Sequence, residues 1–309
     1  MQERRTTLRL KGAPQNSTQE PAPYATTSAT ELMEATFEVC RAHSRMDALS
    51  LPSGTGKTFF SNIHASASDG LVAVARIPGP GLASAQEALI KSVAPRLLCP
   101  VQASFLDDDK VVEMPRALSI ARERLPHFLR WSFAAWNQRS QGQKLLLIVD
   151  DLHALRLPAS IDGFIRQIDE ARAGFGIGVV YLGSQELLLS KFHAAQSLDR
   201  RFSRPGRLPS IKDAADRLSD QTLFHYSDLT DENLTNYVLW LGYDASAAAQ
   251  ICRLRRERRL RPSFRRIKEL LCEAAMATDS SPAEWLEHSV GGLPPSPRPK
   301  ISRISRSAA

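Results

Sequence analysis

The sequence predicts an α/β fold in which a parallel central sheet is flanked by helices and followed by a small C-terminal helical lid. Three observations support this prediction. A glycine-containing stretch at residues 51–58 connects a short apolar segment to a helical one. Residues 144–155 contain five consecutive apolar residues followed by two carboxylates, as expected of a buried strand in a parallel sheet. After residue 223, apolar residues recur only with helical spacing.

Strand and helix patterns alternate along the first two thirds of the chain. Apolar periodicity predicts helices at residues 31–43, 57–65, 84–98, 115–139 and 161–173, with Pro126 as a potential break in the fourth. β-Branched and apolar runs predict strands at residues 47–51, 71–77, 145–149 and 176–182, of which the first is weak. A short segment at residues 223–226 leads to helices at residues 230–241, 245–254 and 263–276, and Thr230 caps the first of these.

Residues 51–58 read Leu-Pro-Ser-Gly-Thr-Gly-Lys-Thr and match a phosphate-binding loop (P-loop) at every defining position except the first. Gly54 and Gly56 allow successive backbone N–H groups to curl around a β-phosphate. Lys57 can reach the β- and γ-phosphates, the Thr58 hydroxyl can bind Mg²⁺, and the next helix points its positive N-terminus at the anion. The stretch therefore predicts ATP and Mg²⁺ as cofactors. The residues expected to contact them are Pro52, Ser53, Gly54, Thr55, Gly56, Lys57, Thr58 and Phe59.

Leu51 departs from the P-loop pattern, which has glycine at this position. A left-handed backbone conformation at Leu51 would cost roughly 1–2 kcal/mol relative to glycine. Pro52 favours β or polyproline geometry in the residue before it, so Leu51 is expected to be extended. Nucleotide binding is therefore expected to survive the substitution.

Asp150 and Asp151 follow the apolar strand and are expected at the carboxyl end of the sheet, beside the P-loop. There Asp150 would hold Mg²⁺ through water, and Asp151 would polarise the attacking water. A glutamate usually fills the second role. Asp151 has one methylene less than a glutamate, which shortens its reach by roughly 1.3–1.5 Å. Misplacement on this scale can cost about 10²-fold in rate, so the sequence predicts slow hydrolysis.

Two further positions have both a catalytic and a plain structural interpretation. Ser184 leaves the carboxyl end of the strand at residues 176–182, where it can sense the γ-phosphate, orient water or simply form a turn. Arg200 or Arg201 can reach the γ-phosphate of a neighbouring subunit as an arginine finger, or form surface ion pairs.

The charge of the chain is compatible with a polyanionic partner: it has 309 residues, a net charge of +7 and a pI of about 9.4. Between residues 253 and 268, eight arginines and one lysine are opposed by Glu257 alone. Contact with a nucleic-acid backbone explains this density better than a solvated helix face. The residues expected to make that contact are Arg255, Arg256, Arg258 and Arg259, whereas Arg265 is expected to contact the nucleotide.

Cysteine usage and hydropathy bear on the compartment. Four cysteines are scattered without a C-x-x-C pair, and neither a signal peptide nor a long apolar run is found. The sequence therefore predicts a soluble cytoplasmic protein with reduced thiols and argues against secretion or a membrane.

The order of these motifs resembles the AAA+ ATPases, and within them it is most similar to bacterial regulators of DNA transposition of the TniB and TnsC kind. The resemblance covers residues 31–280 and is carried by residues 52–58, 148–153, 183–184, 201–202 and 208–209. It implies homo-oligomeric rings or filaments that form on duplex DNA with ATP between subunits. Such assemblies work with a transposase and target-selection proteins and disassemble on hydrolysis. It also implies Ser184 as the first sensor, Arg201 or Arg200 as the finger in trans, and Arg265 as the second sensor.

The expected organisation has four parts: a disordered basic arm at residues 1–30, a nucleotide-binding AAA+ core at 31–210, a helical lid at 211–285 and a disordered basic tail at 286–309. Two other functions stay open. One is a different AAA+ machine, such as a loader of replication proteins or a secretion-associated ATPase. The other is a nucleotide-binding scaffold that hydrolyses little.

Overall fold

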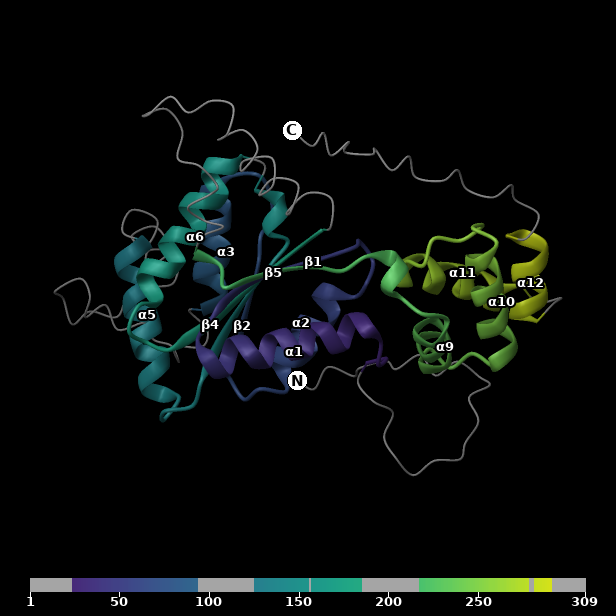
Figure 1. The fold of residues 1–309 in the computed structure, drawn as a ribbon, viewed down its shortest axis with the longest axis horizontal. Helices are drawn as coiled ribbons and strands as arrows, with labels where there is room; N and C mark the ends of the chain where they lie inside the picture. Colours follow the sequence, from purple (N-terminus) through teal and green to yellow (C-terminus); the bar gives the residue numbers. More distant parts are fainter. Residues whose placement is uncertain (1–23, 94–124, 156, 185–216, 278–280, 291–309) are drawn as a thin grey trace, which may run out of the picture. The chain divides into compact units, whose positions relative to one another are not determined.

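The computed structural model describes residues 24–93, 125–155, 157–184, 217–277 and 281–290. They form two compact units, of which the first is residues 28–228 and the second is residues 229–290 together with residues 24–27 (Figure 1). The first unit contains the sheet and its helices, and the second contains short helices only. No helix among the described residues is long and apolar enough to cross a membrane.

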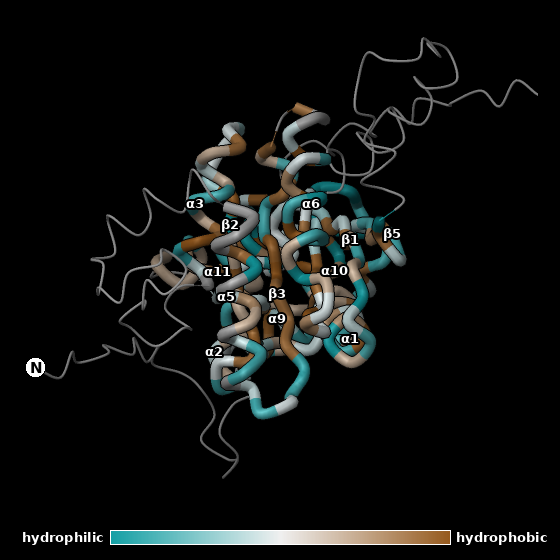
Figure 2. The backbone as a smooth tube through the Cα atoms, turned by 90° about the vertical axis from the view of Figure 1, so that its left-hand side faces the viewer, coloured by the Kyte–Doolittle hydropathy of each residue, from teal (hydrophilic) through white to brown (hydrophobic). Residues whose placement is uncertain are grey.

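The first unit is built on a five-stranded parallel sheet with the strand order β2-β3-β4-β1-β5. The strands are β1 (Met46–Leu51), β2 (Val72–Arg76), β3 (Leu145–Asp150), β4 (Ile177–Ser184) and β5 (Asp220–Leu223). β1 and β3 are buried along their whole length, and the hydrophobic character of β3 stands out in Figure 2. Because all strands are parallel, their carboxyl ends meet at one edge of the sheet.

Helices cover both faces of the sheet (Figure 1). α1 (Ser28–His43) and α2 (Lys57–Ser66) pack together on one face, where Phe37 of α1 contacts Phe60 and His64 of α2. α3 (Leu82–Val93), α5 (Leu125–Arg139) and α6 (Pro158–Arg172) pack against one another on the other face.

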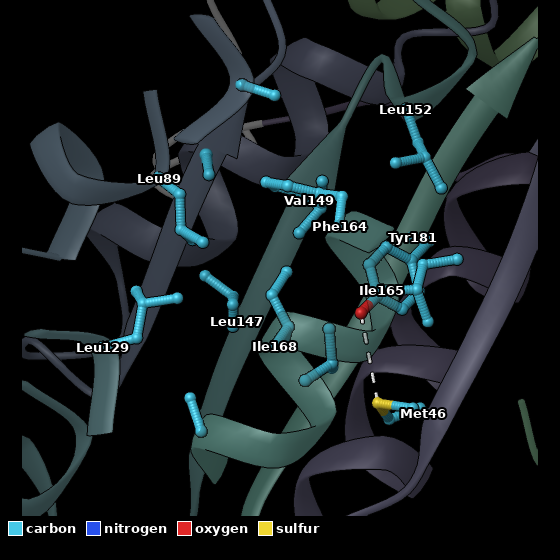
Figure 3. Close-up of a cluster of buried hydrophobic side chains, with 14 of the residues drawn as sticks. Met46, Leu89, Leu129, Leu147, Val149, Leu152, Phe164, Ile165, Ile168 and Tyr181 are labelled. Carbon is cyan, nitrogen blue, oxygen red and sulfur yellow. Dashed lines mark hydrogen bonds between the residues drawn. The ribbon is translucent and has the colours of Figure 1, made fainter. Parts of the chain in front are cut away.

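The main hydrophobic core lies between the sheet and the second group of helices. Alternate residues of the strands point into it, as the period of two along a strand requires. Figure 3 shows Leu147 and Val149 of β3 among side chains of α3, α5 and α6 such as Leu89, Leu129 and Phe164. This core holds β3 and β4 rigidly, so the groups at their carboxyl ends are well positioned.

The second unit consists of α9 (Asp231–Trp240), α10 (Ala245–Arg256), α11 (Phe264–Met276) and α12 (Pro282–Ser289). α9 and α12 both begin with a capping box. In each, the N-cap hydroxyl accepts a hydrogen bond from the backbone N–H of the third helical residue, whose side chain accepts one from the backbone N–H of the N-cap residue. The predicted cap at Thr230 is thus confirmed. Buried residues such as Leu234, Ile251 and Leu271 form the core of this unit.

The structure corrects the predicted boundaries in three places. α1 begins at Ser28, so residues 28–30 belong to a helix and not to the arm. β5 spans Asp220–Leu223 and pairs with β1, so residues 217–228 belong to the sheet unit and not to the lid. α12 was not predicted and includes residues 286–289 of the expected tail.

β5 was not predicted because an exposed edge strand of polar residues has no apolar run. The predicted helix at residues 115–139 is described only from Leu125, and from there α5 continues through Pro126 to Arg139 without a break.

Candidate functional site

The P-loop connects β1 to α2 at the carboxyl edge of the sheet. Leu51 ends β1 as a buried, extended residue, which confirms the expected backbone conformation. Gly54 and Gly56 have φ angles of 81° and 88°. These left-handed conformations would strain any residue with a side chain, so both glycines are needed for the loop to close around an anion.

Three carbonyl groups of the loop are held by hydrogen bonds from side chains. The Thr55 hydroxyl donates to the carbonyl of Pro52 at 2.9 Å, and the Lys57 ammonium donates to the carbonyls of Leu51 and Pro52 at 3.1 and 3.0 Å. The third carbonyl, that of Ser53, accepts from the hydroxyl of Tyr226 at 2.5 Å. These bonds fix the directions of the three carbonyls, and they hold the Lys57 ammonium at the loop.

Thr58 and Asp150 meet across the site, although they are 92 residues apart in the chain. The Thr58 hydroxyl donates to a carboxylate oxygen of Asp150 at 2.5 Å. Asp150 is fully buried, and this burial raises its pKa, against which the hydrogen bond from Thr58 acts. A buried carboxylate beside a hydroxyl is a pair of hard oxygen ligands, and the described residues therefore fit Mg²⁺ at this point.

Asp151 points to a different partner from Asp150. It has a left-handed backbone with φ of 60°, and its carboxylate accepts from Arg76 of β2 at 3.0 Å. Nδ1 of His153 lies 4.0 Å from the other carboxylate oxygen of Asp151. These three residues, with Ile77, Pro78 and Ala154, line a cleft of about 380 Å³.

Ser184 is brought to the same edge of the sheet. It ends β4 and stands opposite Leu51 in the register of β4 with β1. Its backbone N–H donates to Nδ1 of His153 at 3.2 Å. His153 had no predicted role; the position of a histidine three residues after Asp150 was visible in the sequence, but its contact with β4 was not.

The structure therefore brings together Lys57, Thr58, Asp150, Asp151 and Ser184. Phe59 lies on the exposed side of α2 with half of its surface accessible. Arg265 lies in the first turn of α11, which belongs to the second unit, whereas the P-loop belongs to the first. Arg200 and Arg201 lie outside the described residues.

The positive charge of residues 253–268 is largely compensated by acids, some near them in the chain and some from other helices. The described part of the second unit has nine basic and eight acidic residues. Of the four predicted DNA-binding residues, Arg255 and Arg256 both pair with Asp231 of α9, and Arg259 pairs with Glu257. Further pairs join Arg253 to Glu257 and Glu287 and Arg266 to Glu269 and Glu273.

Several cations of this segment are exposed, and among them Arg258 has a left-handed backbone. Arg261, Arg265 and Lys268 are also exposed, and they form no ion pair with any residue that the structure describes. The pattern of local charge thus overstates the positive surface that the folded unit offers.

The parallel sheet, the glycine-containing loop between β1 and α2, and the acids at the end of β3 define the class of the protein. It has the α/β fold of the P-loop nucleoside triphosphatases, which confirms the predicted fold class.

Comparisons with known proteins give neither a family nor a curated relative. Similar solved structures include the Walker-type ATPase Paby2304 of Pyrococcus abyssi, with 14% identity, a TM-score of 0.42, and coverage of 84% of this chain and 65% of that one. Another is PCH-2 of C. elegans, with 12% identity, a TM-score of 0.41, and coverage of 85% and 67%. The chain thus spans less than two thirds of the length of the archaeal ATPase.

Proposed function

We propose that the protein binds ATP with Mg²⁺ and hydrolyses it slowly. The observation that carries the proposal is the bond of 2.5 Å between Thr58 and the buried Asp150. It places a hydroxyl and a carboxylate from two distant segments beside Lys57, at the N-terminus of α2. This combination of a cation, hard oxygen ligands and a helix N-terminus suits a nucleoside triphosphate with its metal ion.

Each residue has a definite task in this function. The loop's N–H groups bind the β-phosphate, and Lys57 exchanges the carbonyls of Leu51 and Pro52 for phosphate oxygens. Thr58 and Asp150 hold Mg²⁺, which neutralises phosphate charge when it is bound. Asp151 accepts a proton from the water that attacks the γ-phosphate, once its carboxylate turns away from Arg76.

Calorimetric titration with ATP, with and without Mg²⁺, tests this proposal. Lys57→Ala removes the only buried lysine of the loop and should abolish measurable binding. Lys91→Ala is the matched control, because Lys91 lies on α3 and pairs with Glu87 on the surface. Wild-type protein that binds no ATP, or a Lys57→Ala variant that binds as tightly as the wild type, contradicts the proposal.

We further propose that ATP binding drives assembly on duplex DNA and that the assembly regulates a transposase, as in AAA+ proteins of the TniB and TnsC kind. Support comes from the motif order and from the exposed cations Arg261 and Lys268, which have no acidic partner among the described residues. Arg255 and Arg256 contribute less than their number suggests, because Asp231 shares their charge.

Duplex-DNA binding with ATP, with ADP and without nucleotide, over a range of salt, tests this second proposal. Each phosphate contact adds about 0.9 to the slope of log affinity against log salt. Arg261→Gln with Lys268→Gln should therefore reduce the slope per subunit by about 1.8, whereas Arg253→Gln, a paired arginine, should leave it unchanged. ATP-dependent assembly without any DNA binding would favour a secretion-associated machine or a scaffold. ATP binding without assembly or hydrolysis would favour the scaffold alone.

A further inference from the structure

The segment that follows β5 is anchored to the P-loop unit at several points. Phe224 is buried, and its N–H donates to the carbonyl of Ser50 in β1 at 2.9 Å. A 3₁₀ turn follows at Tyr226–Asp228. The Asp228 carboxylate accepts from the N–H of His225 at 2.7 Å, and the Asp228 carbonyl accepts from the hydroxyl of Ser28 at 3.1 Å. The position of this turn is therefore well defined.

From this turn, the hydroxyl of Tyr226 donates to the carbonyl of Ser53 at 2.5 Å, across 173 positions of sequence. Ser53 is exposed, so water could satisfy its carbonyl without any help from the protein. The bond is therefore not needed to avoid a buried unsatisfied group. Its effect is to fix the direction in which the carbonyl points.

The direction of a carbonyl determines the direction of the next N–H group. A peptide group is planar and trans, so its C=O and N–H point to opposite sides. Holding the Ser53 carbonyl toward Tyr226 turns the N–H of Gly54 the other way. The same reasoning applies one peptide earlier, where Thr55 holds the carbonyl of Pro52 and so directs the N–H of Ser53. Thr55 lies inside the loop itself, whereas Tyr226 comes from the far end of the unit.

We propose that Tyr226 is a positioning residue for phosphate binding, which acts by holding the Ser53–Gly54 peptide with its N–H turned toward the phosphate. This inference rests on the proposed binding of ATP and adds a residue to that site. Tyr226 also lies two positions before the end of the first unit. The chain that leads to the helical unit is thereby bonded directly to the phosphate-binding loop.

The test compares Tyr226→Phe with the wild type by titration of ATP and of ADP in the full-length protein. Without this bond the peptide is no longer held in place, which should weaken the binding of both nucleotides by a similar factor, about two- to tenfold, because both carry the β-phosphate. The melting temperature without nucleotide should fall no further than in the control variants, each of which also loses one hydrogen bond. Tyr237→Phe and Tyr243→Phe are matched controls, since their hydroxyls also donate to carbonyls, those of Phe264 and Leu271 in the second unit.

Five outcomes are distinguished. Weaker binding of both nucleotides by Tyr226→Phe alone, with a melting temperature no lower than those of the control variants, supports the inference. Unchanged affinity in Tyr226→Phe overturns it, as does an equal loss in either control variant. Unchanged affinity in Tyr226→Phe with a loss in Tyr226→Leu overturns it as well, because the ring and not the hydroxyl would then matter. Failure of the wild type to bind ATP is a separate result, which contradicts the proposed function itself.

Discussion

Replacement of Asp151 by glutamate should accelerate ATP hydrolysis, and the structure allows two explanations of the proposed slow hydrolysis to be weighed against each other. In the first, the aspartate is one methylene too short to reach the attacking water. In the second, the ion pair with Arg76 holds the carboxylate away from it. Asp151→Glu tests the first explanation, and Arg76→Gln tests the second.

The magnitudes favour the first explanation. The Arg76 side chain is 64% exposed, and a pair this open to water is worth at most about 1 kcal/mol, or roughly a fivefold effect on rate. A displacement of roughly 1.5 Å at the reacting group can cost about 10²-fold. We therefore expect Asp151→Glu to raise the rate by at least tenfold and Arg76→Gln to change it by less than fivefold.

The backbone at this position explains why an aspartate is tolerated there. Asp151 has a φ of 60°, a left-handed conformation that aspartate adopts more readily than glutamate. The glutamate variant should therefore gain activity and lose a little stability, of the order of 0.5 kcal/mol.

Steady-state phosphate release at saturating ATP and Mg²⁺ measures both variants, and Asp151→Asn provides the baseline without a base. A faster Arg76→Gln variant beside an unchanged Asp151→Glu variant would refute the reasoning, because the ion pair and not the reach would then limit the rate. A rate in Asp151→Asn equal to that of the wild type would show that Asp151 takes no part.

Three further predictions concern stability. Gly178→Ala would place a Cβ 2.2 Å from the backbone carbonyl oxygen of Cys40, so we expect the free energy of unfolding, measured by urea denaturation, to fall by about 3 kcal/mol or more. Gly163→Ala in α6 is the control: its Cβ would have no atom within 4 Å, so the free energy of unfolding should rise by about 0.5–1 kcal/mol. Burial lowers the pKa of His64 below that of the unfolded chain, so the neutral ring contributes stability above the unfolded pKa. This contribution is lost as the pH falls through the lower pKa of the folded state. In His64→Phe, the free energy of unfolding should therefore decline less between about pH 7.5 and 5.5 than in the wild type. Thr230→Ala should destabilise α9 by about 1 kcal/mol, seen as faster amide exchange at Asn233, and Thr230→Asp should restore the protection.

The parts of the site that could be predicted from the sequence depend on local signals. The P-loop motif specifies its own backbone, and the apolar run before Asp150 specifies a buried strand. The meeting of Thr58 with Asp150 then follows, because the carboxyl ends of parallel strands share one edge of the sheet.

The parts that could not be predicted depend on which strands are neighbours. The partner of Asp151 is an arginine of β2, and the pairing of Arg76 with Asp150 in the register of β2 with β3 places it there. No pattern within either strand specifies that they are adjacent. Tyr226 was missed for a similar reason: β5 is a polar edge strand, and only its pairing with β1 brings the following turn to the P-loop.

The charge of the C-terminal unit shows the same limit and changes what the proposed DNA contact requires. Asp231 and Glu287, which pair with arginines of α10, come from α9 and α12, so a count along residues 253–268 cannot include them. Two or three phosphate contacts per subunit give weak binding at physiological salt. Tight binding then needs many subunits on one duplex, because linked weak contacts multiply. Under the proposed ATP-driven assembly, a Lys57→Ala variant cannot assemble and should therefore lose DNA affinity, although none of its surface arginines has changed.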